Sequence, residues 1–191
     1  MKGLHMYDKR RVLVVVDMQN DFCLPGGALS NADCVAAVPA VERLVESGDW
    51  DRIVFTKDSH RGDYMSTLEG VKLPVPHCAR HTMGWSVVQP LTRFLGGDNV
   101  KVVEKSTFGS LDLRDAVGPL YREDELHVCG VCTSICVLVN CALLRTWFPD
   151  NRIYVHEEAV ADVSPSMNEE ALDCLESFQC DVLRVPRGAV Q

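Results

Sequence analysis

Six short runs of β-branched and other apolar residues restrict the possible folds more than any other feature of the sequence. They cover residues 11–17, 52–58, 100–105, 125–131, 152–160 and 180–186. Each run is nearly continuous in apolar residues, as expected of strands buried on both faces of a sheet. Windows with helix-like patterns lie between them, at residues 33–47, 85–95, 111–122, 134–148 and 167–178.

This alternation predicts an α/β fold with one doubly wound, Rossmann-like domain over residues 1–191. The sheet should have six mostly parallel strands with helices on both faces. We expect the strand order 3-2-1-4-5-6, which is common for sheets of this kind. The order matters for function, because it makes the first and fourth strands neighbours.

Charge and composition exclude several classes of protein. A net charge of −8 argues against a nucleic-acid partner, because a basic footprint is missing. No apolar run reaches the ~18 residues of a membrane-spanning helix. The polar residues 1–10 lack the apolar core of a signal peptide. We therefore expect a cytoplasmic protein with no nucleic acid and no membrane as partner. Nine cysteines without a secretion signal favour reduced thiols over disulfides.

Reactive side chains follow four successive strand runs. They are Asp17 after the first, Asp58 and His60 after the second, Lys105 at the end of the third and Cys136 after the fourth. Parallel α/β sheets bind ligands beyond the carboxyl ends of their strands. Five such residues at four strand ends therefore predict an active site at this edge of the sheet.

Cys136 is the candidate nucleophile among the four cysteines of the segment CGVCTSICVLVNC, residues 129–141. We expect it in the first turn of a helix, with Thr133 or Ser134 as the N-cap. The helix dipole and free N–H groups would lower the pKa of its thiol. The same N–H groups could hold an oxyanion.

The other three cysteines of this segment have structural interpretations. Cys129 should lie inside a strand and Cys141 in the core-facing part of a helix. A redox pair of Cys132 and Cys136 remains an alternative, as does a metal cluster of all four thiols. The cluster is disfavoured, because a strand, turn and helix scatter the side chains that would have to converge.

Asp17 is the candidate base that a nucleophilic cysteine requires. It ends a buried apolar run, where burial should raise the pKa of its carboxyl group. Lys105 could hold this carboxylate or polarise the substrate. Simpler roles are a loop cap for Asp17 and a solvated strand end for Lys105.

The Pro- and His-rich segment 59–84 is long for an irregular loop, and we expect it to carry metal and substrate contacts. Asp58 and His60 are two residues apart and point the same way if strand geometry continues. With His77 they make a three-ligand set suited to Zn²⁺, Fe²⁺ or Mn²⁺, and Glu69 is a fourth candidate. The remaining histidines should be hydrogen-bonding residues: His5, His81, His127 and His156.

Several motifs in order resemble those of the isochorismatase-like cysteine hydrolases, and within them the nicotinamidases. The resemblance extends over nearly the whole chain. The motifs are VVDMQNDFCLPGGAL (15–29), FTKDSH (55–60), PHCARHTMGW (76–85), EKSTF (104–108) and GVCTSICVLVNCALL (130–144).

The resemblance implies a catalytic triad of Asp17, Lys105 and Cys136. It implies an oxyanion hole from the backbone N–H groups of Cys132 and Cys136, with a cis peptide before Cys132. One divalent metal ion, first zinc and otherwise iron or manganese, would be held by Asp58, His60 and His77, with Glu69 as an extra ligand in some members. The substrate pocket would include two aromatic residues: Phe22 and Phe108.

The implied reaction is hydrolysis of nicotinamide to nicotinate and ammonia through a cysteine thioester. The alternative is a related cysteine amidase for another small amide or carbamoyl compound. A non-haem iron oxygenase would leave the triad without a role. Family members range from monomers to larger assemblies, so a homo-oligomer remains open.

Four features of the sequence depart from the family pattern. Ser134 replaces a frequent Asp, and Pro74 stands where nicotinamidases commonly have an aromatic residue. The segment after Lys105 is shorter than usual, and HTMG replaces the commoner GTxG. These departures leave the catalytic set intact and affect the ring pocket.

Overall fold

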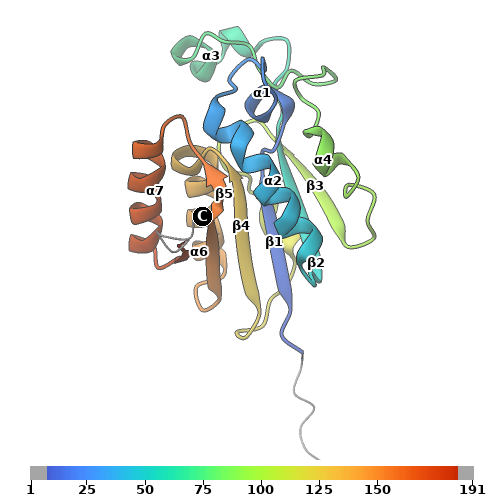
Figure 1. The fold of residues 1–191 in the computed structure, drawn as a ribbon, viewed down its shortest axis with the longest axis vertical. Coiled ribbons are helices and arrows are strands. Elements are labelled where there is room, and N and C mark those ends of the chain that lie inside the picture. The colour runs from blue at the N-terminus through green and yellow to red at the C-terminus, as the bar shows by residue number, and fades with distance from the viewer. Residues whose placement is uncertain (1–7, 185–191) are drawn as a thin grey trace, which may run out of the picture.

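The computed structural model describes residues 8–184 and contains a six-stranded sheet in the order β3-β2-β1-β4-β5-β6. Every pairing of neighbouring strands is parallel. The predicted α/β fold and strand order are therefore confirmed (Figure 1). The strands are β1 (Arg11–Val16), β2 (Arg52–Asp58), β3 (Val100–Lys105), β4 (Glu125–Val131), β5 (Arg152–Ala161) and β6 (Asp181–Leu183).

Helices cover both faces of the sheet (Figure 1). One face packs against α2 (Ala32–Ser47) and α4 (Gln89–Thr92), with the short α1 (Asn20–Cys23) beside them. The other face packs against α5 (Leu113–Val117), α6 (Leu138–Trp147) and α7 (Pro165–Ser177). None of the helices in residues 8–184 is both long and apolar enough to cross a bilayer.

The central strand β1 supplies both cores, because its side chains alternate between the two faces. Leu13 and Val15 face one core, whereas Val12, Val14 and Val16 face the other. Val16 lies opposite Gly130 of β4 in the sheet register. The two strands therefore end at the same level, which brings the residues that follow them together.

Gly130 marks a close approach between β1 and β4. Its φ is +112°, and a Cβ atom built there would lie 2.1 Å from the carbonyl oxygen of Val16. Only glycine combines that backbone angle with so little space. The position fixes the path of the chain into the turn that carries Cys136.

Some predicted helices are shorter in the structure. Of residues 85–95, only Gln89–Thr92 are α-helical, and the chain reaches Gly96 and Gly97 soon afterwards. Of residues 111–122, only Leu113–Val117 are helical, because Gly118 at φ +80° ends the helix. The predicted helix 134–148 begins as a π-helical turn, η2 (Thr133–Val137), before α6.

Segment 59–84 is not fully irregular, since it contains a 3₁₀ turn, η1 (Tyr64–Ser66), and the short helix α3 (Leu68–Lys72). The Thr67 side chain caps α3 by accepting a hydrogen bond from the N–H of Gly70. The last strand is shorter than predicted. Its expected residues 185 and 186, like His5, lie outside the described residues.

Candidate active site

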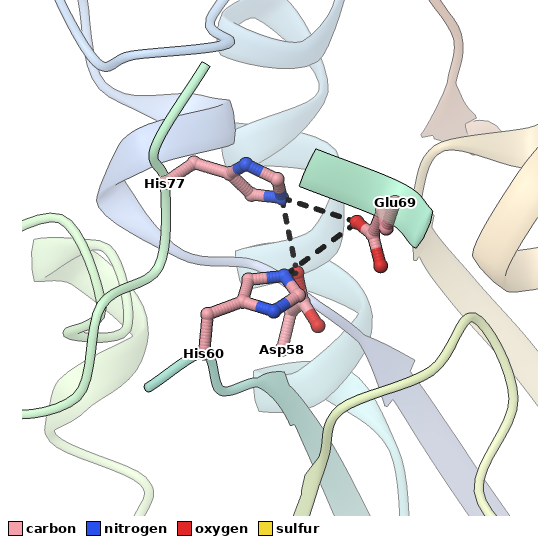
Figure 2. Close-up of side chains that lie close together, drawn as sticks. All are labelled: Asp58, His60, Glu69 and His77. Carbon is pink, nitrogen blue, oxygen red and sulfur yellow. Dashed lines mark hydrogen bonds and ion pairs between the residues drawn. The ribbon is translucent and has the colours of Figure 1, made fainter. Parts of the chain in front are cut away.

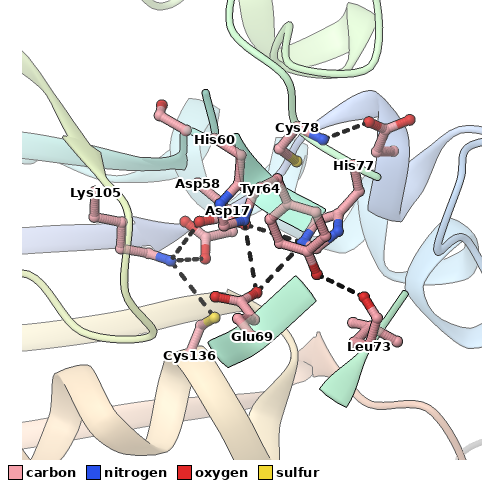
Figure 3. A network of polar contacts seen from close by, with 12 residues as sticks. Asp17, Asp58, His60, Tyr64, Glu69, Leu73, His77, Cys78, Lys105 and Cys136 are labelled. Atoms are coloured by element: carbon pink, nitrogen blue, oxygen red, sulfur yellow. Dashed lines mark hydrogen bonds and ion pairs between the residues drawn. The ribbon is translucent and has the colours of Figure 1, made fainter. Parts of the chain in front are cut away.

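Four strand ends bring the predicted reactive residues together at one edge of the sheet (Figure 3). Asp17 follows β1 in a left-handed conformation, with φ at +50°. Asp58 ends β2 and is the register partner of Lys105, which ends β3. Cys136 lies in η2, directly after β4. The parallel order thus places a carboxylate, an ammonium and a thiol beside one another.

Lys105 lies at the centre of this group. Its Nζ is 2.6 Å from Asp17 Oδ2, 3.6 Å from Cys136 Sγ and 3.8 Å from Asp58 Oδ1. All four residues are buried. Thr56 donates a 2.7 Å hydrogen bond to Asp17 Oδ1, which holds the carboxylate in place. Sequence reasoning did not select Thr56, because it lies inside a strand run.

Burial and neighbouring charges set the protonation of this group. Burial raises the pKa of Asp17, as predicted, while Lys105 opposes the rise. Burial alone would lower the pKa of Lys105, but the charges of Asp17, Cys136 and Asp58 raise it, so the amine stays protonated. Burial and the charge of Asp17 raise the pKa of Cys136, although Lys105 acts in the opposite direction.

The prediction that Cys136 lies in a favourable helix start was therefore wrong in two respects. The thiol pKa is raised rather than lowered, because burial and a carboxylate outweigh the helix end. Neither Thr133 nor Ser134 caps the turn with its side chain. The Ser134 N–H instead donates to the carboxylate of Asp162, and Thr133 Oγ1 lies 2.6 Å from Asn168 Oδ1.

The backbone of the turn has two further notable features. The peptide bond between Val131 and Cys132 is cis, as the family resemblance implied. The N–H of Val137 donates to the carbonyl of Cys132 over 3.1 Å, which is the wide i→i+5 pattern of a π turn. Such turns are frequent at functional sites.

The four cysteines of residues 129–141 do not bring their thiols together at one site. All nine cysteines are free, and Cys129 and Cys141 are fully buried in the two cores. The Cys132 thiol hydrogen-bonds with Cys34, which raises the pKa of Cys132. Among the described residues, the one group arranged to hold a metal ion contains no cysteine. These observations favour separate roles for the four thiols.

A cluster of carboxylates and imidazoles lies beside the thiol group: Asp58, His60, Glu69 and His77. Their ligand atoms all lie within 4.8 Å of one another, and Figure 2 shows the side chains converging. Asp58 Oδ2 is 2.8 Å from His60 Nε2 and 3.3 Å from His77 Nε2. Glu69 Oε1 is 3.6 Å and 3.8 Å from the same two nitrogens.

The donor set fits a divalent cation. His77 Nδ1 lies 2.8 Å from the carbonyl oxygen of Val75, which requires a proton on Nδ1. In the neutral ring, Nε2 then presents a lone pair toward Asp58 Oδ2. A cation between two such acceptors stabilises the arrangement, and a carbonyl holding the other ring nitrogen is usual for ligating histidines. Two imidazoles with carboxylates suit zinc or iron.

Residues after β1 hold this group of carboxylates and imidazoles in place through hydrogen bonds. The Gln19 side chain accepts from the N–H of Asp58 at 2.7 Å and donates to its carbonyl at 2.8 Å. Asp21 accepts a 2.7 Å bond from the N–H of Cys78, next to His77. Sequence reasoning assigned neither residue a role. The available signal was a polar run, QND, directly after a buried strand.

A cavity of about 950 Å³ opens beside these groups. The buried His60 and Lys105 and the partly buried Glu69 line its inner part, and the half-exposed Phe108 lies on its wall. Phe22 does not line this cavity; its ring packs 5.7 Å from that of His77. Cys136 is 8% exposed.

The remaining predicted non-site histidines lie apart from this cluster. His127 and His156 contact each other across β4 and β5, with Nδ1 and Nε2 3.0 Å apart. His81 packs against Trp85, with ring centroids 5.5 Å apart. None of the three belongs to the metal-ligand group.

Comparisons with known proteins agree with this geometry. The family model for the isochorismatase domain matches residues 11–186. The nicotinamidase/pyrazinamidase of Mycobacterium tuberculosis is 40% identical over 139 residues, covering 66% of this chain and 74% of the relative.

Two solved structures share the fold and most of its length. The nicotinamidase/pyrazinamidase PncA of Bacillus subtilis has a TM-score of 0.79 at 27% identity, covering 92% of this chain and 100% of that one. The pyrazinamidase of Pyrococcus horikoshii, solved in complex with zinc, has a TM-score of 0.72 at 25% identity, covering 92% and 99%. The chain belongs to the isochorismatase family, and within it to the branch that contains the nicotinamidases.

Proposed function

We propose that this amide hydrolase is a metal-dependent nicotinamidase that converts nicotinamide to nicotinate and ammonia through a cysteine thioester. The main support is the position of Lys105, whose ammonium lies 3.6 Å from the Cys136 thiol and 3.8 Å from Asp58 of the metal cluster. A ligand held at the cluster would therefore lie next to the thiol. The relatives named for nicotinamide and pyrazinamide hydrolysis point to the same substrate class.

The first step would be proton transfer from Cys136 to Asp17. The carboxylate of Asp17 raises the pKa of the thiol, so moving the proton onto Asp17 removes the charge that opposed ionisation. The thiolate is then paired with the Lys105 ammonium and attacks the carboxamide carbon. The backbone N–H groups of Cys132 and Cys136 would stabilise the oxyanion.

Collapse of the tetrahedral intermediate releases ammonia. Asp17 returns its proton to the leaving nitrogen, and the acyl group remains on Cys136 as a thioester. Asp17 then takes a proton from a water molecule, and the hydroxide attacks the thioester. The acid is released, and Asp17 returns the proton to the Cys136 thiolate.

A divalent cation held by Asp58, His60 and His77, with Glu69 as a further ligand, would supply a binding point for the pyridine nitrogen. The residues of this chain would orient the ring from that point, and positioning of this kind lowers barriers substantially. Zinc is the first expectation, in line with the zinc complex of the Pyrococcus horikoshii relative.

A coupled ammonia assay tests the proposal. The panel is nicotinamide, pyrazinamide and several aliphatic amides, each with and without chelator. We expect turnover of the pyridine and pyrazine amides, lost with chelator and restored by Zn²⁺. Turnover of aliphatic amides alone would indicate the related amidase instead, and chelator-resistant turnover would remove the metal from the proposal.

A further inference from the structure

The cavity beside the active site is larger than a pyridinecarboxamide requires. Its volume of about 950 Å³ is near the upper end of the ~300–1,000 Å³ typical of sites for drug-sized ligands. Nicotinamide is a single six-membered ring with one short substituent. A ring bound near His60, Glu69 and Lys105 would occupy the inner part and leave the outer part free.

The outer wall of the cavity carries apolar side chains that are open to solvent. Leu68 of α3 is 76% exposed and Phe108, after β3, is 48% exposed. Leu73 and Ile135 also line the cavity. Several large apolar side chains gathered around one cavity are typical of ligand-binding surfaces.

Charges on the cavity wall do not favour a charged ligand. Arg61 and Lys72 are accompanied by Asp63, and Arg80 pairs with Glu104 at 3.0 Å. Both signs are thus present. The wall therefore presents charges of both signs beside a group of exposed apolar side chains.

We propose that the preferred substrate is an aromatic carboxamide with an apolar extension on its ring, bound between α3 and Phe108. This inference rests on the proposed amidase function and narrows its substrate class. Removing apolar atoms from water is favourable by ~0.8 kcal/mol per methylene, or about fourfold in an equilibrium constant. An extension of three or more carbons should therefore raise kcat/KM by about tenfold or more over nicotinamide.

The direct test is a series of nicotinamides with methyl, propyl or phenyl groups at ring position 5 or 6, assayed on the zinc-loaded protein. We expect kcat/KM to rise with extension size in at least one series. Turnover of nicotinamide without any gain from extension would overturn this inference and leave the proposed function intact. Failure to hydrolyse any aromatic amide would overturn both.

A matched pair of surface variants tests whether the apolar extension of the substrate binds beside Leu68. Leu68 and Leu111 are 76% and 77% exposed, but only Leu68 lines the cavity. Neither serine variant removes core packing, so both should fold. We expect Leu68→Ser to bring the ratio of kcat/KM for propyl-nicotinamide to that for nicotinamide down toward one, and Leu111→Ser to leave it unchanged. Equal effects of the two variants would overturn the assignment.

Discussion

At the scale of single residues, the proposed mechanism depends on the Cys136 thiol, whose sulfur lies 3.6 Å from Lys105 Nζ. We expect Cys136→Ala to lower kcat by about 10³-fold or more, because loss of the nucleophile removes the covalent path. Ammonia release from nicotinamide measures the effect. Cys174→Ser is the control, since Cys174 lies on α7, outside the site. Substantial turnover by the alanine variant would refute the thioester mechanism.

Asn140 is a second residue whose effect can be predicted. Its side-chain nitrogen donates to the carbonyls of Cys136 at 2.8 Å and Phe108 at 3.2 Å, and its oxygen accepts from the N–H of Ser110 at 3.1 Å. It therefore links the turn that contains Cys136 to the cavity wall near Phe108. We expect Asn140→Asp to lower kcat about tenfold or more, because small displacements of a reactive group are costly.

The control for Asn140 is Asn151→Asp. Asn151 is also buried and donates to two carbonyls, those of Tyr121 and Asp124, but it precedes β5 at the opposite end of the sheet. A purely structural role would make both variants lose thermal stability and neither lose kcat selectively. A positioning role predicts a lower kcat and slower alkylation of Cys136 by iodoacetamide in Asn140→Asp alone.

At the scale of secondary structure, the pairing of β4 with β5 buries His127 against His156. Burial, together with the charge of Arg11, lowers the pKa of each ring to about 4; for His127, the charge of His156 adds to this. The unfolded chain has an ordinary histidine pKa of ~6.5, so it binds protons at a higher pH than the folded chain. The neutral pair thus contributes stability above pH ~6.5 that is lost as the pH falls toward 4.

We expect the folded chain to lose on the order of 2–3 kcal/mol of unfolding free energy per ring between pH ~6.5 and ~4. Urea unfolding at several pH values measures it. The double variant His127→Gln, His156→Gln should show a flatter pH dependence than the original chain. His81→Gln, at an exposed loop position, should keep the original slope. Parallel slopes for the double variant and the original chain would contradict this account.

At the scale of the whole molecule, the candidate metal ligands join the end of β2 to the loop that carries α3 and His77. A cation that binds the folded chain alone stabilises it by about 2.7 kcal/mol at one hundred times its dissociation constant. For a chain of this size that corresponds to a Tm increase of roughly 5–10 °C. Thermal scans with Zn²⁺ and with chelator measure the shift. The variant His60→Ala should show little response, and an equal response would place the cation elsewhere.

Much of this architecture could be predicted from local patterns, because strands buried on both faces leave continuous apolar runs. The side chains at the strand ends followed from those runs, and the strand order followed from the arrangement that is common among doubly wound sheets. The helix boundaries at Gly118 and after Thr92 were missed, since periodicity alone extended the predicted helices past residues that end them. The predicted metal ligands were adjacent in sequence or lay in one loop, which made their convergence foreseeable.

Other features depend on contacts between distant residues. The environment of Cys136 is set by Asp17 and Lys105, which no local pattern around TSIC could reveal. The turn is held by Asp162 rather than by its own hydroxyl groups. The support that Gln19 provides for Asp58 also required the packed structure. Local sequence thus indicated which side chains gather at the strand ends, and tertiary packing determines the direction in which their pKa values shift.

The close contact of Gly130 with the Val16 carbonyl has a practical consequence for protein engineering. Saturation mutagenesis at this position should yield almost no active clones, even though Gly130 belongs neither to the cavity lining nor to the candidate metal ligands. Directed evolution of the enzyme toward other amides would do better to leave residues 129–132 unchanged and to diversify the exposed rim around Leu68 and Phe108.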